Sequence, residues 1–230
     1  MESRKHGNAR LPFQVSNGDR LQAVGVPGGC RTVPGAMMGA RLPYEFLAPI
    51  RTTRLVLRAM TDEDVDDIHA YQSRPDVCRY LPFEPRTREE VSEKVAKYST
   101  ALVLSCDGDF WQLAIERAGD PGHVIGDLYF TIKDAANSHC EIGWTLHPDH
   151  TGTGYMTEAA RAVLRIAFND LGLHRASAVL DPRNHASAAL CRRLGMREEA
   201  RFVEDLWFKG SWGDTAIYAI LDREWAAHAT

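Results

Sequence analysis

Apolar runs separated by turn residues predict the strands of this chain. Between residues 110 and 146, three such runs follow one another with no helical pattern between them, which indicates strands joined by short turns. A mostly apolar run after residue 175 predicts a buried strand, and two runs near the end of the chain predict a closing hairpin. The predicted strands cover about residues 54–58, 110–117, 123–132, 139–146, 176–180, 199–208 and 214–221.

A helical period marks the segment after residue 155, where apolar residues recur at i, i+3, i+4, i+7, i+8 and i+11. They are Ala160, Val163, Leu164, Ala167, Phe168 and Leu171. Helix-start residues predict three further helices, because a cap followed by acidic or helix-forming residues begins each of them. These helices start at about Thr61, Thr87 and Asn184; the second reaches about Leu102 and the third stops at Gly195. The order β-α-α-β-β-β-α-β-α-β-β predicts an α/β domain with a mixed sheet.

Residues 1–45 lack this periodicity. They are rich in Gly, Pro and Arg, and Val26-Pro27-Gly28-Gly29 breaks any regular element. We therefore expect a flexible extension over residues 1–45, followed by a single domain over residues 46–230.

The composition narrows the functional class. With 44% hydrophobic and 25% charged residues, the chain is typical of a globular protein, and no apolar run reaches the roughly 18 residues of a membrane span. The five cysteines are scattered without a C-x-x-C pair, which predicts no metal site and a reducing, cytoplasmic compartment. Residues 1–51 carry seven basic and three acidic residues, a net +4, so the rest carries −8. A net charge of −8 on the residues after 51 argues against nucleic-acid binding.

A loop with two glycines connects the strand at 139–146 to the strongest helix. In Thr151-Gly152-Thr153-Gly154-Tyr155-Met156, successive backbone N–H groups can converge at the helix N-terminus, and glycines let a phosphate approach closely. The loop is not a P-loop, because Gly-Lys-Ser/Thr is absent, and Thr157 stands where a dinucleotide motif has its third glycine. On this pattern alone, a plain strand-to-helix turn fits equally well.

The residues around the loop resemble a known family. Glu-Ile-Gly-Trp-x-Leu-x-Pro, then Gly-x-Gly-Tyr-x-Thr-Glu-Ala-Ala, is similar to the central motif of the GNAT N-acetyltransferase superfamily, especially the branch with the ribosomal-protein alanine N-acetyltransferases. Asn184-x-x-Ser187, ending in Leu194-Gly195-Met196, resembles the next motif of that branch. The resemblance covers about residues 50–225. It implies a single GNAT-like domain whose mixed, mostly antiparallel sheet is flanked by helices and splayed at the coenzyme strand.

The resemblance also implies a binding site for acetyl-coenzyme A (acetyl-CoA). Its pyrophosphate would bind the backbone amides of Thr151, Gly152, Thr153, Gly154, Tyr155 and Met156. Its pantetheine arm would pair with the strand residues Trp144, Thr145 and Leu146, and its amides would contact Asn184. Two positions depart from the family pattern, which usually has Gln or Arg at Thr151 and Gly or Ala at Met156. Both departures could weaken affinity, but neither removes an amide donor.

Acetyl transfer to an amine requires a neutral nitrogen. Neutralising a lysine-like amine of pKa ~10.4 at about pH 7 costs about 4 to 5 kcal/mol, whereas an α-amine of pKa ~8 costs about 1 to 1.5 kcal/mol. A modest base is therefore sufficient for an α-amine. Glu141 is the first candidate, although a strand carboxylate on the surface would look the same. Glu204 or Asp205 is the alternative, and strand alternation lets only one of them point inward.

The leaving thiolate needs a proton or a hydrogen bond. The resemblance assigns this role to Ser187, although a helix serine can also serve only as a cap or solvent contact. Cys191 occupies the position at which many relatives have a tyrosine. A helical cysteine beside leucines is usually a small core residue, so we expect direct transfer and no acyl-enzyme.

These features predict an N-acetyltransferase acting on a primary amine, and the branch resemblance favours a protein N-terminal α-amine. An amino acid, polyamine or aminoglycoside stays open as acceptor. Alternatives are an acyl-CoA sensor without catalysis and an unrelated nucleotide-binding protein. The aromatic residues Trp207, Phe208 and Trp212 could line the acceptor pocket or a homodimer interface, or simply pack on the strands.

Overall fold

The computed structural model describes residues 39–228, so most of the predicted extension lies outside the described residues. The strands are β1 (Tyr44–Glu45), β2 (Ile50–Arg51), β3 (Leu55–Ala59), β4 (Val103–Leu104), β5 (Phe110–Arg117), β6 (Asp120–Asp134), β7 (His139–Leu146), β8 (Arg175–Leu180), β9 (Arg197–Phe208) and β10 (Ser211–Leu221). The α-helices are α1 (Val65–Gln72), α2 (Pro75–Cys78), α3 (Arg88–Tyr98), α4 (Tyr155–Arg165), α5 (His185–Arg193) and α6 (Asp222–His228). Short helical turns lie at η1 (Asp62–Asp64), η2 (Pro148–His150) and the π-helical η3 (Ile166–Asp170).

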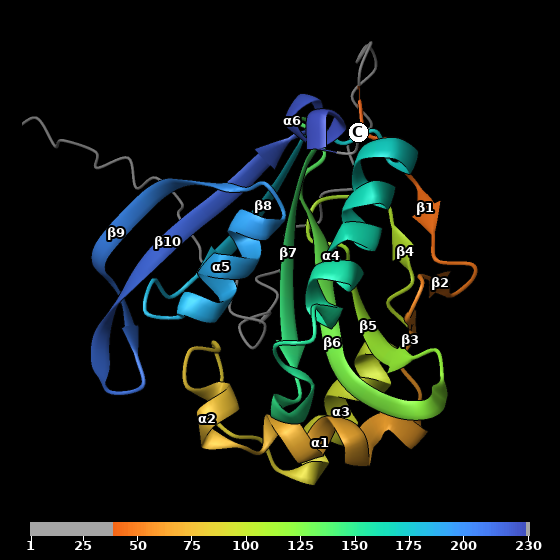
Figure 1. Cartoon of the computed structure of the whole chain (residues 1–230), viewed down its shortest axis with the longest axis vertical. Helices are drawn as coiled ribbons and strands as arrows, with labels where there is room; N and C mark the ends of the chain where they lie inside the picture. Colours follow the sequence, from red (N-terminus) through yellow and green to blue (C-terminus); the bar gives the residue numbers. More distant parts are fainter. Residues whose placement is uncertain (1–38, 229–230) are drawn as a thin grey trace, which may run out of the picture.

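One eight-stranded sheet forms the centre, in the order β2-β3-β5-β6-β7-β8-β10-β9, while β1 and β4 form a separate pair (Figure 1). Neighbouring strands are antiparallel except for β7 and β8, which are parallel. The predicted α/β domain with a mixed, mostly antiparallel sheet is therefore confirmed.

The parallel pair separates soon after it begins. β7 pairs with β8 only from His139↔Arg175 to Glu141↔Ser177, whereas on its other side β7 stays paired with β6 as far as Leu146↔Gly126. The two strands then diverge (Figure 1). We call the diverging parts, residues 142–146 of β7 and 178–180 of β8, the β7–β8 fork. The fork leaves one edge of β7 with backbone groups that can pair with an extended ligand.

Helices cover both faces of the sheet. Helices α4 and α5 pack on the face of the sheet to which Cys140 and Ile142 of β7 point. The apolar residues of both helices and these two strand residues belong to the main core cluster. Helices α1 and α3 pack on the opposite face, in a smaller cluster that includes Ala114 and Val124. The apolar face predicted for the helix after residue 155 therefore packs on the core. This packing holds α4 against β7, the strand predicted to bind the coenzyme. No helix among residues 39–228 is long and apolar enough to cross a membrane.

The structure corrects several predicted boundaries. The second predicted helix ends at Tyr98 instead of about Leu102, because residues 103–104 form β4. The predicted strand at 123–132 extends over Asp120–Asp134, and α6 has no counterpart in the prediction. Before residue 46, Tyr44 packs on Trp111 with ring centroids 5.6 Å apart, and Arg41 donates to the carbonyl of Asn169 at 2.9 Å. The packed body therefore begins ahead of the boundary that the composition suggested.

Candidate functional site

The glycine loop lies between η2 and α4. Gly152 has φ +74° and Gly154, the N-cap of α4, has φ +82°, a region of backbone space that favours glycine at both positions. The hydroxyls of Thr151 and Thr153 each donate to the carbonyl three residues earlier, at 2.8 and 2.7 Å. These bonds hold the loop in a compact curve that leads directly into the helix.

The loop presents backbone donors at a helix N-terminus. The first turn of an α-helix leaves its N–H groups without intrahelical partners, and the helix dipole adds positive potential there. Thr151 differs from the other predicted donors, because its N–H already donates to the carbonyl of Pro148 at 3.1 Å. The amides from Gly152 onward are thus the better candidates for binding an anion.

An arginine that the sequence prediction did not assign to the site lies against this loop. The guanidinium of Arg54 donates to the Thr153 carbonyl at 3.1 Å and lies 4.7 Å from the ring centroid of Tyr155. A Cβ on Gly154 would stand 3.5 Å from its Nη2. Arg54 precedes β3 in the sequence, so only the fold brings its charge to the start of α4. The position adds a side-chain cation to the predicted phosphate site.

Glu158 of α4 holds Arg54 in this position. Its carboxylate accepts from Arg54 Nε at 2.7 Å, from the Arg54 backbone N–H at 2.8 Å and from Thr52 Oγ1 at 2.6 Å. Partial burial disfavours its ionised form, but these hydrogen bonds outweigh burial and hold the pKa of Glu158 below its usual range. Glu158 is the Glu of the Thr-Glu-Ala-Ala motif, so a sequence signal existed for it, although not for its partner.

Replacing Arg54 with Ala should weaken binding of acetyl-CoA by about tenfold, because the variant lacks the guanidinium that is expected to contact the pyrophosphate. Calorimetric titration of acetyl-CoA, repeated at higher salt, measures this loss. The matched control is Arg88→Ala, which removes an exposed arginine that pairs with Asp66 on the α1–α3 side. An affinity equal to that of the wild type would show that Arg54 only supports the loop.

Beside the fork, three predicted residues come together. The indole Nε1 of Trp144 on β7 donates to the hydroxyl of Ser187 on α5 at 3.3 Å. Asn184 caps α5, because its Oδ1 accepts from the Ser187 N–H at 3.1 Å. The cap occupies the side-chain oxygen of Asn184 and leaves its amide nitrogen for another acceptor. Ser187 and Asn184 therefore stand next to the strand edge that the fork leaves unpaired.

Glu141 lies at the start of the fork, on the other face of β7. It is separated from Trp144 by three positions, so the two side chains project to opposite faces. Its carboxylate lies 3.1 Å from Lys133 Nζ, and its side chain is 14% exposed. Glu141 and Ser187 thus approach the fork from different faces. Glu204 and Asp205, of which alternation lets only one point inward, are both exposed on β9, an edge strand that β8 and β10 separate from β7.

Cys191 is fully buried in the main core cluster. Burial raises the pKa of its thiol to about 12, so the thiol is neutral near pH 7. A neutral, enclosed thiol is a poor nucleophile, which supports direct transfer over an acyl-enzyme.

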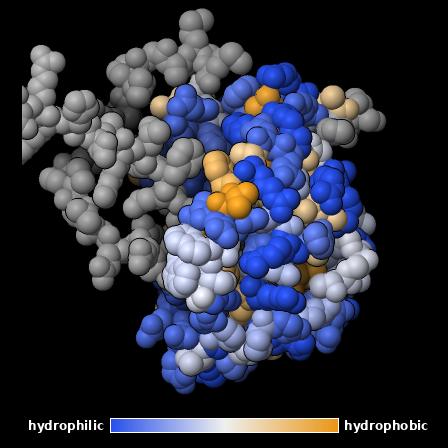
Figure 2. All heavy atoms as spheres, turned by 90° about the vertical axis from the view of Figure 1, so that its left-hand side faces the viewer, coloured by the Kyte–Doolittle hydropathy of each residue, from blue (hydrophilic) through white to orange (hydrophobic). Residues whose placement is uncertain are grey.

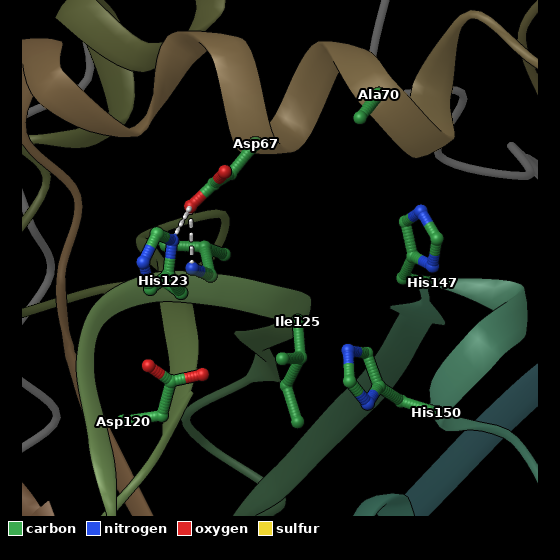
Figure 3. Close-up of a pocket in the computed structure, with 8 residues that line it drawn as sticks. Asp67, Ala70, Asp120, His123, Ile125, His147 and His150 are labelled. Atoms are coloured by element: carbon green, nitrogen blue, oxygen red, sulfur yellow. Dashed lines mark hydrogen bonds and ion pairs between the residues drawn. The ribbon is translucent and has the colours of Figure 1, made fainter.

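A cavity of about 350 Å³ adjoins the segment that leads into the glycine loop. Figure 3 shows Asp67 and Ala70 of α1 above it, and His147 and His150 at the end of β7 and in η2. The histidines are engaged separately: His123 approaches Asp67 at 3.9 Å, and His147 Nδ1 accepts from the Asp149 N–H. Burial, followed by the charge of Arg117, lowers the pKa of His150. Within residues 39–228 no group of side chains is arranged to hold a metal ion.

The family model for the acetyltransferase (GNAT) domain matches residues 54–197. The chain belongs to the GNAT family of acetyltransferases, and its acetyl donor is acetyl-CoA. The match spans the segment from Arg54, through β7, the glycine loop and α4, to the end of α5, and so includes the site described above. The resemblance to the GNAT superfamily is therefore confirmed, and the chain is an N-acetyltransferase.

Individual relatives agree with this family. The chain is 31% identical to the uncharacterized N-acetyltransferase YnaD of Bacillus subtilis (strain 168), over 76% of this chain and 98% of that one. It is 31% identical to the putative ribosomal N-acetyltransferase YdaF of the same organism, over 45% and 57%. Identity to the spermidine N(1)-acetyltransferase of Escherichia coli (strain K12) is 22%, over 74% and 88%. A solved GNAT-family acetyltransferase from Bacillus anthracis superposes with a TM-score of 0.68 at 29% identity, over 76% and 99%.

Proposed function

We propose that this enzyme transfers acetyl from acetyl-CoA directly to the α-amine at the N-terminus of a peptide or protein. The observation that carries the proposal is the β7–β8 fork, which has the glycine loop at the end of β7 and the Ser187–Asn184 start of α5 beside it. The resemblance to the ribosomal-protein branch and the similarity to YdaF support a protein acceptor.

In the proposed complex, the amides from Gly152 to Met156 and the guanidinium of Arg54 bind the pyrophosphate. The pantetheine arm then extends along the free edge of Trp144, Thr145 and Leu146, as an additional strand would. Asn184 donates to a pantetheine carbonyl through its free amide nitrogen. This arrangement brings the thioester to the narrow end of the fork, between Glu141 on one face and Ser187 on the other.

The transfer step follows from these positions. The neutral amine nitrogen attacks the thioester carbonyl carbon, and the C–S bond breaks as the new C–N bond forms. Glu141 takes the proton that the amine loses, directly or through a water molecule. Ser187 donates a hydrogen bond to the leaving sulfur, which departs as the thiolate of coenzyme A and takes a proton from solvent. Because an α-amine is neutralised at a cost of only about 1 to 1.5 kcal/mol, a carboxylate engaged by Lys133 is a sufficient base.

Cellular setting and assembly are further parts of the proposal. Among residues 39–228, Cys78, Cys140 and Cys191 are buried cysteines that form no disulfide, which agrees with a reducing cytoplasm. On the face in Figure 2, a few apolar side chains lie among hydrophilic ones. On the β9–β10 hairpin, Trp207 and Trp212 are 61% and 55% exposed and pack edge to face. Exposed aromatic residues of this kind are compatible with a homodimer interface.

The acceptor assignment is tested by measuring release of free thiol from acetyl-CoA with a thiol reagent. We expect release with a peptide that has a free α-amine and acetylated lysines, and mass spectrometry should place one acetyl group at its N-terminus. A peptide with a blocked N-terminus and free lysines is the matched control and should be inactive. Turnover of spermidine alone would overturn the peptide assignment. Tight binding of acetyl-CoA without thiol release from any amine would instead favour the sensor.

A further inference from the structure

A basic pocket lies where three separate segments meet near the fork. It has a volume of about 150 Å³ and is lined by Arg79, Tyr80, Arg183, Phe208, Lys209 and Ser211. Lys209, in the turn between β9 and β10, donates to the Cys78 carbonyl at the end of α2 at 2.6 Å, which ties the two segments together. Figure 1 shows α2 and this turn below α5, on the side of β7 where the fork opens.

The pocket is connected to the proposed catalytic groups by the chain itself. Arg183 immediately precedes Asn184, the residue that caps α5 and bonds the Ser187 N–H. An extended peptide rises about 3.3 Å per residue, so the second and third residues of an acceptor lie within about 10 Å of its N-terminus, and these are the positions whose side chains the pocket is proposed to bind.

The lining carries three cations and no carboxylate. Two of the cations have acidic neighbours, since Arg183 forms a two-pronged pair with Asp181 and Lys209 lies 3.8 Å from Glu84. Arg79 has no such neighbour: among residues 39–228 it forms no ion pair, and its guanidinium lies over the ring of Tyr80 at 5.3 Å. The exposed guanidinium of Arg79 is therefore available to an anion from outside.

The chemistry of the lining selects a carboxylate. A guanidinium presents a planar fork of donors that matches a carboxylate, and Tyr80 and Phe208 can pack on the apolar stem of a Glu or Asp side chain. A polyamine or a basic side chain would meet like charge in the same place. The size of the pocket suits one side chain and not a second cofactor.

We propose that this pocket binds a carboxylate of the acceptor, so that the enzyme prefers peptides with an acidic residue close to the N-terminus. The inference rests on the proposed function, because it takes the acceptor to be a peptide. A free acidic amino acid offers the same chemical group, so the test must separate these two sources.

The test uses N-terminal alanine peptides that differ only in carrying Glu, Gln or Lys at the second and third positions. For the wild-type enzyme, kcat/KM should be about tenfold or more higher with the Glu peptide than with the Gln peptide, and lowest with the Lys peptide. Arg79→Gln should bring the Glu-to-Gln ratio close to one. Arg79→Glu should reverse the order, so that the Lys peptide becomes the better acceptor. Arg88→Gln, an exposed arginine on α3, should leave the order unchanged.

Binding without turnover keeps the two proposals apart. Calorimetric titration of N-acetylated Glu and Gln peptides into the enzyme with coenzyme A measures the affinity of each peptide without turnover. Acetylation of all peptides with equal efficiency would overturn the pocket and leave the proposed function standing. Arg79-dependent binding of the Glu peptide without acetylation of any peptide would keep the pocket and overturn the function. Faster turnover of free glutamate than of the Glu peptide would overturn the peptide as the source of the carboxylate.

Discussion

Replacing Gly154 with Pro is expected to abolish measurable binding of acetyl-CoA, with a loss in affinity of more than about a hundredfold. Gly154 has φ +82°, whereas proline holds φ near −65°, so the chain must leave its present path at the N-cap of α4. Proline also removes one N–H from the set that we propose binds the pyrophosphate. The changed backbone path and the lost N–H donor therefore both act on the glycine loop, whose backbone geometry is proposed to form the site.

Calorimetric titration of acetyl-CoA into the variant measures this loss, and circular dichroism confirms that the domain still folds. Gly108→Pro is the matched control. Gly108 also has a positive φ, +86°, but it lies between β4 and β5, away from α4. It should show the structural cost of the same change without loss of coenzyme affinity. If Gly154→Pro binds acetyl-CoA as the wild type does, the glycine loop is only a turn.

Replacing Ser187 with Ala is expected to lower kcat by about a hundredfold, in the range for loss of a positioned proton donor, while KM for acetyl-CoA changes little. The hydroxyl is the polar group on α5 that meets Trp144 at the fork. Its loss removes stabilisation of the leaving sulfur, and the Asn184 cap remains because it uses the backbone N–H of residue 187. The effect should therefore fall on the chemical step and not on binding.

Steady-state kinetics with a peptide acceptor, together with the pH profile of kcat, measure this effect. Ser92→Ala, in helix α3 on the opposite face of the sheet, is the control and should retain full activity. Ser187→Thr keeps a hydroxyl and should recover part of the lost rate. An unchanged kcat in Ser187→Ala would mean that the sulfur leaves with the help of solvent or another group.

Local patterns predicted the parts of the fold that local physics determines. The helix after residue 155 and the loop before it were visible, because an apolar period and two glycines are properties of a short segment. The two-residue strands β1, β2 and β4 and the helices α2 and α6 were missed, since such short elements depend on tertiary contacts and not on propensity. The packing of Tyr44 against Trp111 is a contact of this kind, and it moved the start of the body ahead of residue 46.

The site divides in the same way. Trp144, Asn184 and Ser187 were predicted from two motifs, and the structure brings them together at hydrogen-bond distance. Arg54 was recognised only as part of an opening strand, because its partner Glu158 lies more than a hundred residues later. The basic pocket draws on three segments that no sequence window contains together. Contacts between residues so far apart in the sequence depend on the order of strands in the sheet, which neither motif spacing nor composition determines.

The measurement that tests the central claim most directly is hydrogen–deuterium exchange of backbone amides, with and without coenzyme A. We predict strong protection in two segments, residues 143–146 of β7 and residues 152–157 at the start of α4. These are the amides proposed to pair with the pantetheine arm and to bind the pyrophosphate. The β9–β10 turn should change little. Protection confined to other segments, with both of these exchanging as in the free protein, would contradict a coenzyme site in the β7–β8 fork.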